Sequence, residues 1–187
     1  MERSVRIHVF GASGVGSTTL GRAMARDIGA IHVDIDDFYW ERSDPPFRRK
    51  VAVPRRIARI RRAINGVDSW VMSGSLVSWG HDFVAAFTHA VFLELDATVR
   101  IARLKHRERE RFGARISLGG DMHEAHNEFM TWASAYDTVP SGQRCRAVHV
   151  AWLASLPCAK LVLDASRPVE GLVADTQRWL ASSSLTD

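Results

Sequence analysis

Cysteine, lysine and long apolar runs are scarce in this sequence. Its two cysteines, Cys145 and Cys158, are too few for a disulfide framework, which fits a reducing compartment. No stretch approaches the roughly 18 uninterrupted apolar residues of a membrane span. The N-terminal MERSVRIHVF also lacks the apolar core of a signal peptide. We therefore expect a cytoplasmic protein with no membrane partner.

Arginine carries nearly all of the positive charge. Of 25 basic residues, only Lys50, Lys105 and Lys160 are lysines, and the net charge is +4. The planar guanidinium binds phosphates and carboxylates in a fork, so the excess fits an anionic ligand. An arginine-biased proteome would explain the same excess without any ligand.

The chain has the length and composition of one domain. With 187 residues, 46% of them hydrophobic, it can bury one full core but not two large ones. We find no internal repeat, low-complexity tract or linker that would divide it. We expect a single domain over residues 1–187.

Short apolar runs alternate with helical patterns along the chain. The runs predict strands over residues 5–10, 30–38, 69–74, 89–96 and 160–166. Spacings of three and four between apolar residues predict helices over 18–29, 54–66, 98–112, 122–136, 141–155 and 169–180. This alternation favours an α/β fold with a parallel sheet between two helical layers, a three-layer sandwich.

A glycine-rich loop follows the first predicted strand in the stretch FGASGVGSTTLG. Compared with the phosphate-binding pattern G-x-x-x-x-G-K-[ST], Gly11 and Gly16 match and Thr18 takes the hydroxyl position. Thr18 would place its oxygen at a magnesium ion that bridges the last two phosphates. The predicted nucleotide-binding residues here are Gly11, Ala12, Ser13, Gly14, Val15, Gly16, Ser17, Thr18 and Thr19.

The loop departs from the pattern at one position, because Ser17 stands where the lysine belongs. Phosphate binding rests mainly on backbone N–H groups and on the positive end of the following helix, and neither needs a lysine. The lysine's charge stabilises the phosphoryl group during transfer. Either another cation takes its place, or the chain is a slow or inactive relative. A tight turn with no ligand is the remaining interpretation.

Taken with the stretches HVDIDDFYW, SWVMSGSLVSW, FLELDATVRIARLKHRERERFG and LVLDASRPVEGLV, the loop resembles the P-loop kinases of nucleoside monophosphates and small molecules. Within that group, the chain looks most like the adenylate-kinase-related proteins labelled DNA topology modulation proteins. The resemblance spans nearly the whole chain. It implies a five-stranded parallel sheet in the order 2-3-1-4-5 and a helical lid over the phosphates.

Two acids follow the second predicted strand. In the similar shikimate-kinase-like enzymes an Asp-x-Asp at this place serves the acceptor, and Asp34 and Asp36 match its spacing. If the strand continues, both carboxylates face the same way. One could then hold water on magnesium while the other orients the acceptor hydroxyl or takes its proton. We expect Asp34 to serve the metal. The alternative is that these acids only end the strand or cap the next element.

Arginines recur at helical spacing after the fourth predicted strand, at positions 100, 103, 107 and 111. The resemblance places Arg103 against the adenine and Arg107, Arg109, Arg111 and Arg115 on the phosphates, with a lid over about residues 107–125. Arg167 would lie near the adenine. We predict that Arg107 or Arg111 replaces the missing lysine and acts catalytically with Asp34 and Asp36. The intervening glutamates leave a solvated, charged helix as the alternative.

The acceptor region is predicted over about residues 37–66. Arginines at positions 55, 59 and 62 share the polar face of a helix and could bind an acceptor phosphate or carboxylate, or could be plain surface. Trp79 could stack on a ring beside Gly74. His123 and His126 are three residues apart on a helix without cysteines, which argues against a metal site there.

The leading hypothesis is therefore an ATP-dependent, Mg²⁺-assisted phosphotransferase. Its acceptor would be a nucleoside monophosphate or a small hydroxy compound, and the chain would be a monomer or a homodimer. A non-catalytic nucleotide-binding module is the second hypothesis, which Ser17 favours. A nucleic acid partner is not expected, because no recognition helix and no platform of aromatic and basic residues is present.

Overall fold

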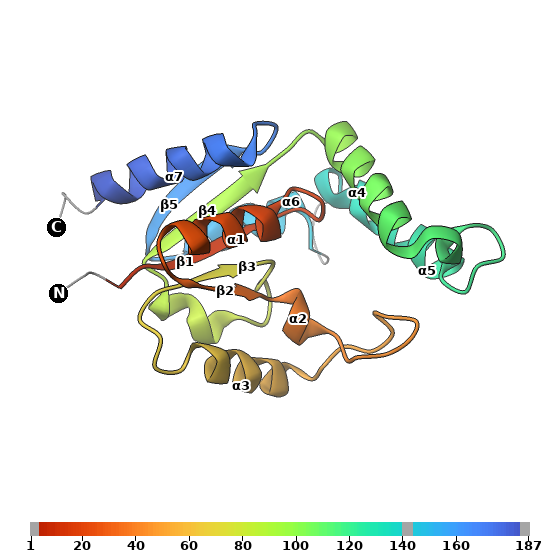
Figure 1. Ribbon diagram of the computed structural model, residues 1–187, viewed down its shortest axis with the longest axis horizontal. Coiled ribbons are helices and arrows are strands. Elements are labelled where there is room, and N and C mark those ends of the chain that lie inside the picture. The colour runs from red at the N-terminus through yellow and green to blue at the C-terminus, as the bar shows by residue number, and fades with distance from the viewer. Residues whose placement is uncertain (1–3, 140–143, 184–187) are drawn as a thin grey trace.

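The computed structural model describes residues 4–139 and 144–183, which form a five-stranded parallel sheet with helices on both faces (Figure 1). The strands are β1 (Arg6–Gly11), β2 (Ile31–Asp34), β3 (Trp70–Ser73), β4 (His89–Glu94) and β5 (Ala159–Asp164). Their order across the sheet is β2-β3-β1-β4-β5, and all four neighbouring pairs are parallel. The predicted fold class and strand order are confirmed.

The predicted helices are also present, with shifted ends. They are α1 (Ser17–Asp27), α3 (Val53–Ile64), α4 (Ala97–Phe112), α5 (His123–Ser134), α6 (Arg146–Ser155) and α7 (Val169–Ser183). Residues 141–143 of the helix predicted over 141–155 lie outside the described residues. The sequence analysis did not predict the short α2 (Asp36–Tyr39) or the 3₁₀ helices η1 (His81–Ala86), η2 (Gly113–Ile116) and η3 (Ala135–Asp137).

Each face of the sheet buries its own apolar cluster. On one face, Val9 and Val91 of the strands pack with Leu20 and Met24 of α1 and Leu172 of α7. Alternate strand residues point to opposite faces, so neighbouring positions supply the other cluster. The sheet is consequently apolar on both sides, as parallel sheets are.

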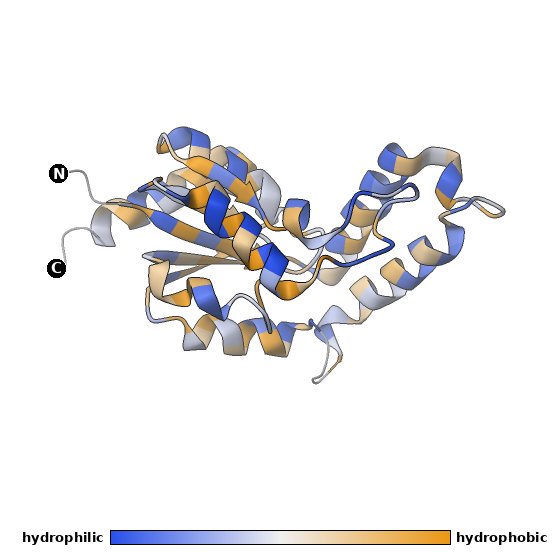
Figure 2. Ribbon diagram, turned by 90° about the horizontal axis from the view of Figure 1, so that it is seen from below, coloured by the Kyte–Doolittle hydropathy of each residue, from blue (hydrophilic) through white to orange (hydrophobic). Residues whose placement is uncertain are grey.

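The second face is covered by α3, η1 and α6. Its cluster joins Phe10 and Trp70 of the strands with Ile60 of α3, Phe83 of η1 and Trp152 of α6. Figure 2 shows apolar and polar residues alternating along the helices that cover the sheet, as expected of helices buried on one side. Two helical layers on one sheet make the predicted three-layer sandwich.

Beyond the sheet, α4, η2 and α5 form an arm. It projects past the carboxyl ends of the strands, on the side opposite both termini, where α2 and the loop over residues 40–50 also lie (Figure 1). Parallel sheets bind ligands at this edge, in the crevice outside the strand ends. The arm and the loop therefore enclose the region where a site is expected.

One predicted strand was too long. The strand expected over 30–38 ends at Asp34, and Asp36 begins the helical turn α2. The backbone N–H of Asp36 donates a hydrogen bond to Asp34 Oδ1 at 3.1 Å, which turns the chain out of the sheet. A hydrogen bond from the backbone to a nearby side chain thus ended a strand that apolar patterning alone would have continued.

None of the helices in the described part of the chain combines the length and the apolar character that a membrane span requires.

Candidate nucleotide and acceptor site

The glycine-rich loop turns through conformations that only glycine adopts easily. Gly14 and Gly16 have φ angles of +85° and +100°. A Cβ at Gly11 would lie 2.5 Å from the carbonyl oxygen of Leu93, so β4 leaves no room for a side chain there. The three glycines thus serve backbone geometry, and the loop has the shape that a phosphate cradle needs.

The positive end of α1 faces the same loop. The helix begins at Ser17 directly after Gly16, and among the described residues no side chain caps its first turn. Its first N–H groups are therefore free for an anion. Thr18 is half-buried in that first turn, whereas Thr19 is exposed. Ser17, the residue at the lysine position, is half-buried at the start of the helix.

The two predicted acids do not share a strand face as expected. Asp34 ends β2, but Asp36 belongs to α2, so period-two geometry does not apply to the pair and that expectation was wrong. The hydrogen bond to the N–H of Asp36 shows that Asp34 has the turn-forming role of the alternative interpretation. The two carboxyl groups still lie close enough for the charge of Asp34 to raise the pKa of Asp36.

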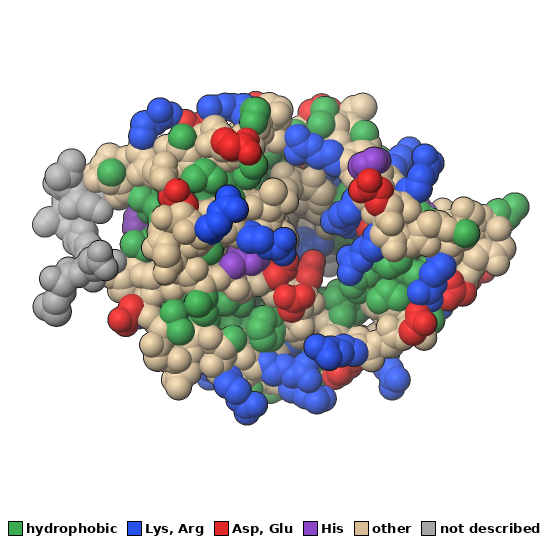
Figure 3. All heavy atoms as spheres, in the orientation of Figure 1, with side chains coloured by type: hydrophobic (Ala, Val, Ile, Leu, Met, Phe, Trp, Pro, Cys, Tyr) green, Lys and Arg blue, Asp and Glu red, His purple; other side chains and the backbone are tan. Residues whose placement is uncertain are grey.

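The pKa of the Asp36 carboxyl group is shifted by its surroundings. Its pKa is raised, first by the protein atoms packed around the carboxyl group and then by the neighbouring charge of Asp34, although the residue still reaches solvent. Arg144 and Arg107 act in the opposite direction and lower this pKa. Figure 3 shows acidic side chains at the mouth of a hollow near the middle of this face, with basic side chains on both sides. A carboxyl group with a raised pKa suits a proton acceptor.

The arginines of α4 do not act as one stripe. Arg107 bonds the buried Glu108 at 2.8 Å. Arg111 lies over the rings of Phe47 and Phe112, 5.1 and 5.2 Å from their centroids. The side chain of Arg109 is exposed. Of these arginines, Arg107 is the one whose charge affects Asp36.

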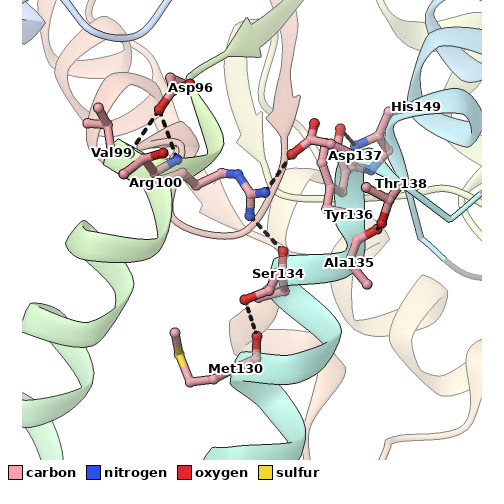
Figure 4. Close-up of polar contacts among 12 residues, drawn as sticks. Asp96, Val99, Arg100, Met130, Ser134, Ala135, Tyr136, Asp137, Thr138 and His149 are labelled. Atoms are coloured by element: carbon pink, nitrogen blue, oxygen red, sulfur yellow. Dashed lines mark hydrogen bonds and ion pairs between the residues drawn. The ribbon is translucent and has the colours of Figure 1, made fainter.

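Arg100, at the start of the predicted stripe, is buried. Figure 4 shows it reaching from α4 toward η3, where its Nη2 lies 2.8 Å from Asp137 Oδ2. Its Nη1 donates to the carbonyl oxygen of Ala133 at 2.9 Å, and its side chain is only 1% exposed. Arg100 therefore joins the two helices of the arm instead of lining the site.

At the predicted adenine side, Arg103 Nη1 donates to the carbonyl oxygen of Ala165 at 3.1 Å. This contact connects α4 to the loop after β5, and the predicted role of Arg103 at the adenine stays a prediction. Arg167, in the same loop, forms an ion pair with Asp175 of α7. The two arginines predicted for the base thus come from neighbouring elements.

The lid region meets the loop over 40–50. Arg115 Nη2 lies 2.6 Å from both Asp44 Oδ1 and Asp121 Oδ2, and the rings of Phe47 and Phe112 are 6.3 Å apart. Arg115, which was predicted to bind phosphate, is thus engaged in contacts across the lid. The predicted boundaries of the lid and of the acceptor region stay predictions.

Two open grooves lie beside the helical turn α2 that carries Asp36 and Asp37. One, of about 520 Å³, is lined by Asp36, Trp40 and Phe47 among others. The other, of about 620 Å³, includes Arg59 and Arg62 of the predicted polar face. Arg55 instead pairs with Glu41 at 3.2 Å. Both grooves fall within the acceptor region predicted over about residues 37–66 or directly beside it, and binding of an acceptor there stays a prediction.

Arg56 was missed by the sequence analysis. It is buried, its Nε donates to the carbonyl oxygen of Val51 at 2.6 Å, and its guanidinium lies 3.8 Å from the ring centroid of Tyr39. A signal was present, because Arg56 precedes Ile60 by four residues and so shares its buried stripe. Trp79 faces the same guanidinium at 5.2 Å and is largely buried. Its predicted stacking on a ligand ring stays a prediction.

Arg144 was also missed, and here the sequence carried no signal. Its Nη2 donates to Ser13 Oγ of the glycine-rich loop at 2.7 Å, across 131 positions of sequence. Its guanidinium lies 4.6 Å from the ring centroid of Trp132. An arginine near the start of a helix is ordinary in sequence, and only the fold brings Arg144 to the loop. Among the described residues, no group of three or more His, Cys, Asp and Glu side chains could hold a metal ion.

The sheet order, the loop and the lid together define the fold of the P-loop kinases. Solved structures with this fold include a gluconokinase from Sinorhizobium meliloti 1021, with 16% identity, a TM-score of 0.54, and 97% of this chain and 94% of the other covered. A shikimate kinase from Aquifex aeolicus has 14% identity, a TM-score of 0.54, and coverage of 98% and 100%. At these identities the likeness establishes the fold alone.

A sequence relative defines the family more narrowly. This chain is 34% identical over 177 residues to the uncharacterized protein YqaC of Bacillus subtilis (strain 168), with 95% of this chain and 98% of the relative covered. The chain belongs to the family of that protein. No family model matches the sequence.

Proposed function

We propose that the protein is an ATP-dependent phosphotransferase that moves the γ-phosphoryl group of ATP to a small acceptor. One observation carries the proposal. An uncapped α1 and a glycine loop with positive φ angles follow β1 at the same edge of the sheet where Asp36 follows β2, and the pKa of Asp36 is raised beside a groove. Donor cradle and acceptor carboxyl group then face each other at the edge of the sheet where such folds bind ligands.

In the proposed reaction, backbone N–H groups of the loop and of the first turn of α1 hold the phosphates of ATP. The bond between the γ-phosphorus and the β–γ bridging oxygen breaks, and a bond forms from the acceptor oxygen to the γ-phosphorus. The acceptor proton passes to the Asp36 carboxylate, with Asp34 as the second candidate, and ADP leaves. Asp36 suits this task because its raised pKa makes it a better proton acceptor than an ordinary aspartate.

The residues of the loop fit Mg²⁺. That ion is commonly held by one or two protein oxygens together with water and the phosphates of a nucleotide, so it needs no cluster of side chains. Thr18 Oγ1 would supply one oxygen and Asp34 a second, directly or through water. When bound, the ion neutralises charge on the phosphates.

We further place the chain near the adenylate-kinase-related proteins and the acceptor among nucleoside monophosphates and small hydroxy compounds. Arg103 and Arg167 would bind the adenine side. Arg107 and Arg111 were predicted to reach the phosphates, and Arg107 is the better supported because its charge acts on Asp36.

The alternative function is a nucleotide-binding module without catalysis, which Ser17 at the lysine position favours. ADP release from Mg²⁺ and ATP, measured over a panel of nucleoside monophosphates, nucleosides and small hydroxy acids, separates the two. We expect turnover with one class of acceptor and loss of turnover, with nucleotide binding retained, in Asp36→Asn. Binding of ATP without turnover on any acceptor would support the module. Absence of any heat of binding at millimolar nucleotide would reject both functions.

A further inference from the structure

Arg144 lies where donor and acceptor would meet. It precedes α6, and its guanidinium bonds Ser13 Oγ on one side and covers the ring of Trp132 on another. The charge of Arg144 lowers the pKa of Asp36 and is the largest of the effects that do so, ahead of Arg107. The guanidinium thus contacts the glycine-rich loop and lies near enough to the Asp36 carboxyl group for the two charges to interact.

Not every N–H donor of the Arg144 guanidinium has a hydrogen-bond acceptor among the described residues. Its Nε is buried and has no hydrogen-bond partner among the described residues. Burial lowers the pKa of Arg144, while the nearby Asp36 is foremost among the groups that raise it. Arginine stays charged in proteins, so the loop holds a partly buried cation with an unused donor. An unsatisfied buried donor is costly, and a bound anion would remove that cost.

The position of Ser13 indicates which phosphate the cation would reach. The inner phosphates of a nucleotide sit over the N–H groups of the loop and the start of α1, and the terminal phosphate faces the acceptor. Arg144 contacts the loop at Ser13, and its charge acts on Asp36. A terminal phosphate transferred from the loop to an acceptor at Asp36 would therefore come within reach of this guanidinium.

The other candidate cations are engaged elsewhere. Arg111 stacks on Phe47 and Phe112, and Arg115 is shared by Asp44 and Asp121. Arg107 is paired with the buried Glu108. Arg144 combines direct contact with the loop and a free donor, a combination that none of these three has in the described structure.

We propose that Arg144 supplies the cation that the loop lacks at Ser17 by contacting the terminal phosphate of a bound nucleoside triphosphate. The proposal rests on the proposed function, because it requires a nucleotide in the loop. It assigns the missing lysine's task to the segment before α6 and not to the lid arginines Arg107 and Arg111.

The test compares nucleotides with and without the terminal phosphate. Calorimetry with Mg²⁺ measures the affinity for ADP and for the non-hydrolysable ATP analogue adenylyl imidodiphosphate. We expect Arg144→Ala to weaken binding of the analogue by about tenfold or more, the scale of a lost charged hydrogen bond, with the affinity for ADP changed less than about twofold. Arg144→Lys should retain most of the affinity. Adding Ser17→Lys to Arg144→Ala should restore preference for the triphosphate.

Two further variants make the comparison specific. Ser13→Ala removes the loop contact but keeps the cation, and Lys105→Ala removes an exposed cation of α4 that belongs to no proposed site. Both should have much smaller effects on binding of the analogue than Arg144→Ala. Where turnover is measurable, Arg144→Ala should lower kcat by about 10²-fold, the scale of one preorganised donor. Melting curves confirm that each variant is folded.

The outcomes are distinguishable. If the natural protein binds ADP and Arg144→Ala loses ADP and the analogue equally, Arg144 shapes the loop and the proposal is wrong. The same holds if Ser13→Ala reproduces the full effect, or if Arg144→Ala changes only the KM for an acceptor. If the natural protein binds no nucleotide, the proposed function itself fails and Arg144 has no such role.

Discussion

Single polar side chains set much of the chemistry of this chain. Asp36 is held in a state that disfavours its charge, and His8 and His149 are buried with the pKa of each lowered to about 3 by desolvation. His8 stacks on Phe10 at 4.6 Å, and His149 bonds Ser75 Oγ and the hydroxyl of Tyr136. Such groups lower the free energy of unfolding at pH values where the unfolded chain would carry their charge. For Asp36 this loss grows as the pH rises, whereas for the two histidines it grows as the pH falls.

Replacing Asp36 should stabilise the fold near neutral pH. A carboxyl group with a raised pKa keeps its proton longer when folded, so the free energy of unfolding falls as pH rises from the ordinary pKa to the raised one. Above that pH window, Asp36→Asn should raise the free energy of unfolding, because the amide carries no charge. Well below the window the aspartate is protonated in both states, so the substitution should bring no such increase. Thermal unfolding between about pH 4 and about pH 8 measures this dependence. Equal stabilisation by Asp37→Asn, from the same turn, would show only a general effect of charge.

The two buried histidines should make the protein sensitive to acid. Both stay neutral in the folded state down to about pH 3, whereas the unfolded chain takes up protons below its ordinary pKa of 6.5. Each histidine then lowers the free energy of unfolding by about 1.4 kcal/mol for every unit by which the pH falls between 6.5 and about 3. His8→Leu should reduce this slope in urea unfolding, whatever it does to stability at neutral pH. An unchanged slope would mean that His8 can be protonated in the folded protein.

Among the helices, α4 does the most to organise the site. Asp96 accepts hydrogen bonds from the N–H groups of Thr98 and Val99 and so caps the helix where it leaves β4, and these bonds lower the pKa of Asp96 (Figure 4). One turn later, Arg100 fastens α5 and η3 to the helix. The arm is therefore anchored at its base by a buried polar contact, while its far end meets the loop over 40–50.

Arg100→Ala should loosen the arm and lower the free energy of unfolding by about 2 kcal/mol, because the carbonyl of Ala133 and the Asp137 carboxylate lose a charged donor. Urea denaturation provides the measurement. Lys105→Ala is the matched control, since its exposed side chain lies on the same helix, and it should change stability by less than about 0.5 kcal/mol. Equal effects of the two substitutions would argue against the anchoring role.

The arm and the loop over residues 40–50 contact each other on the far side of the candidate site from the sheet, so together with the sheet they form a closed ring of elements. The sheet supplies the loop after β1 and the acids after β2, the arm passes over them, and Phe47, Arg48 and Asp44 of the opposite loop meet the arm. These contacts are mostly exposed ion pairs and one aromatic pair, which contribute little individually. The ring should therefore open and close more readily than the sheet unfolds.

Phe47→Ala should raise amide hydrogen exchange over residues 111–121, within the predicted lid, by about fivefold, the scale of one lost aromatic contact, without affecting the strands. Mass spectrometry of exchange resolves the two regions. Leu118→Ala is the control, because that side chain is apolar and 90% exposed at the tip of the same region. Faster exchange in the strands as well, or no change in the lid, would contradict a lid held by the opposite loop.

The sequence was sufficient for the order and type of the main elements. Alternating apolar runs and helical spacings predicted the α/β sandwich because strands buried on both faces and helices buried on one face need different patterns. The loop around Gly14 and Gly16 was predictable for a local reason, since its backbone angles belong to glycine. The order of the strands came from the resemblance, and the structure confirmed it.

Tertiary structure alone decided how the arginines are used. Sequence spacing indicates on which face of a helix an arginine lies, but not which residue it contacts. Arg100 and Arg111 were therefore assigned to one stripe, although Arg100 is buried and Arg111 lies over the ring of Phe47. Asp36 turned out of its strand through one local hydrogen bond. Arg144 reached Ser13 because parallel strands gather loops from distant parts of the chain at one edge. Contacts of that kind depend on three-dimensional distance, which spacing along the sequence does not encode.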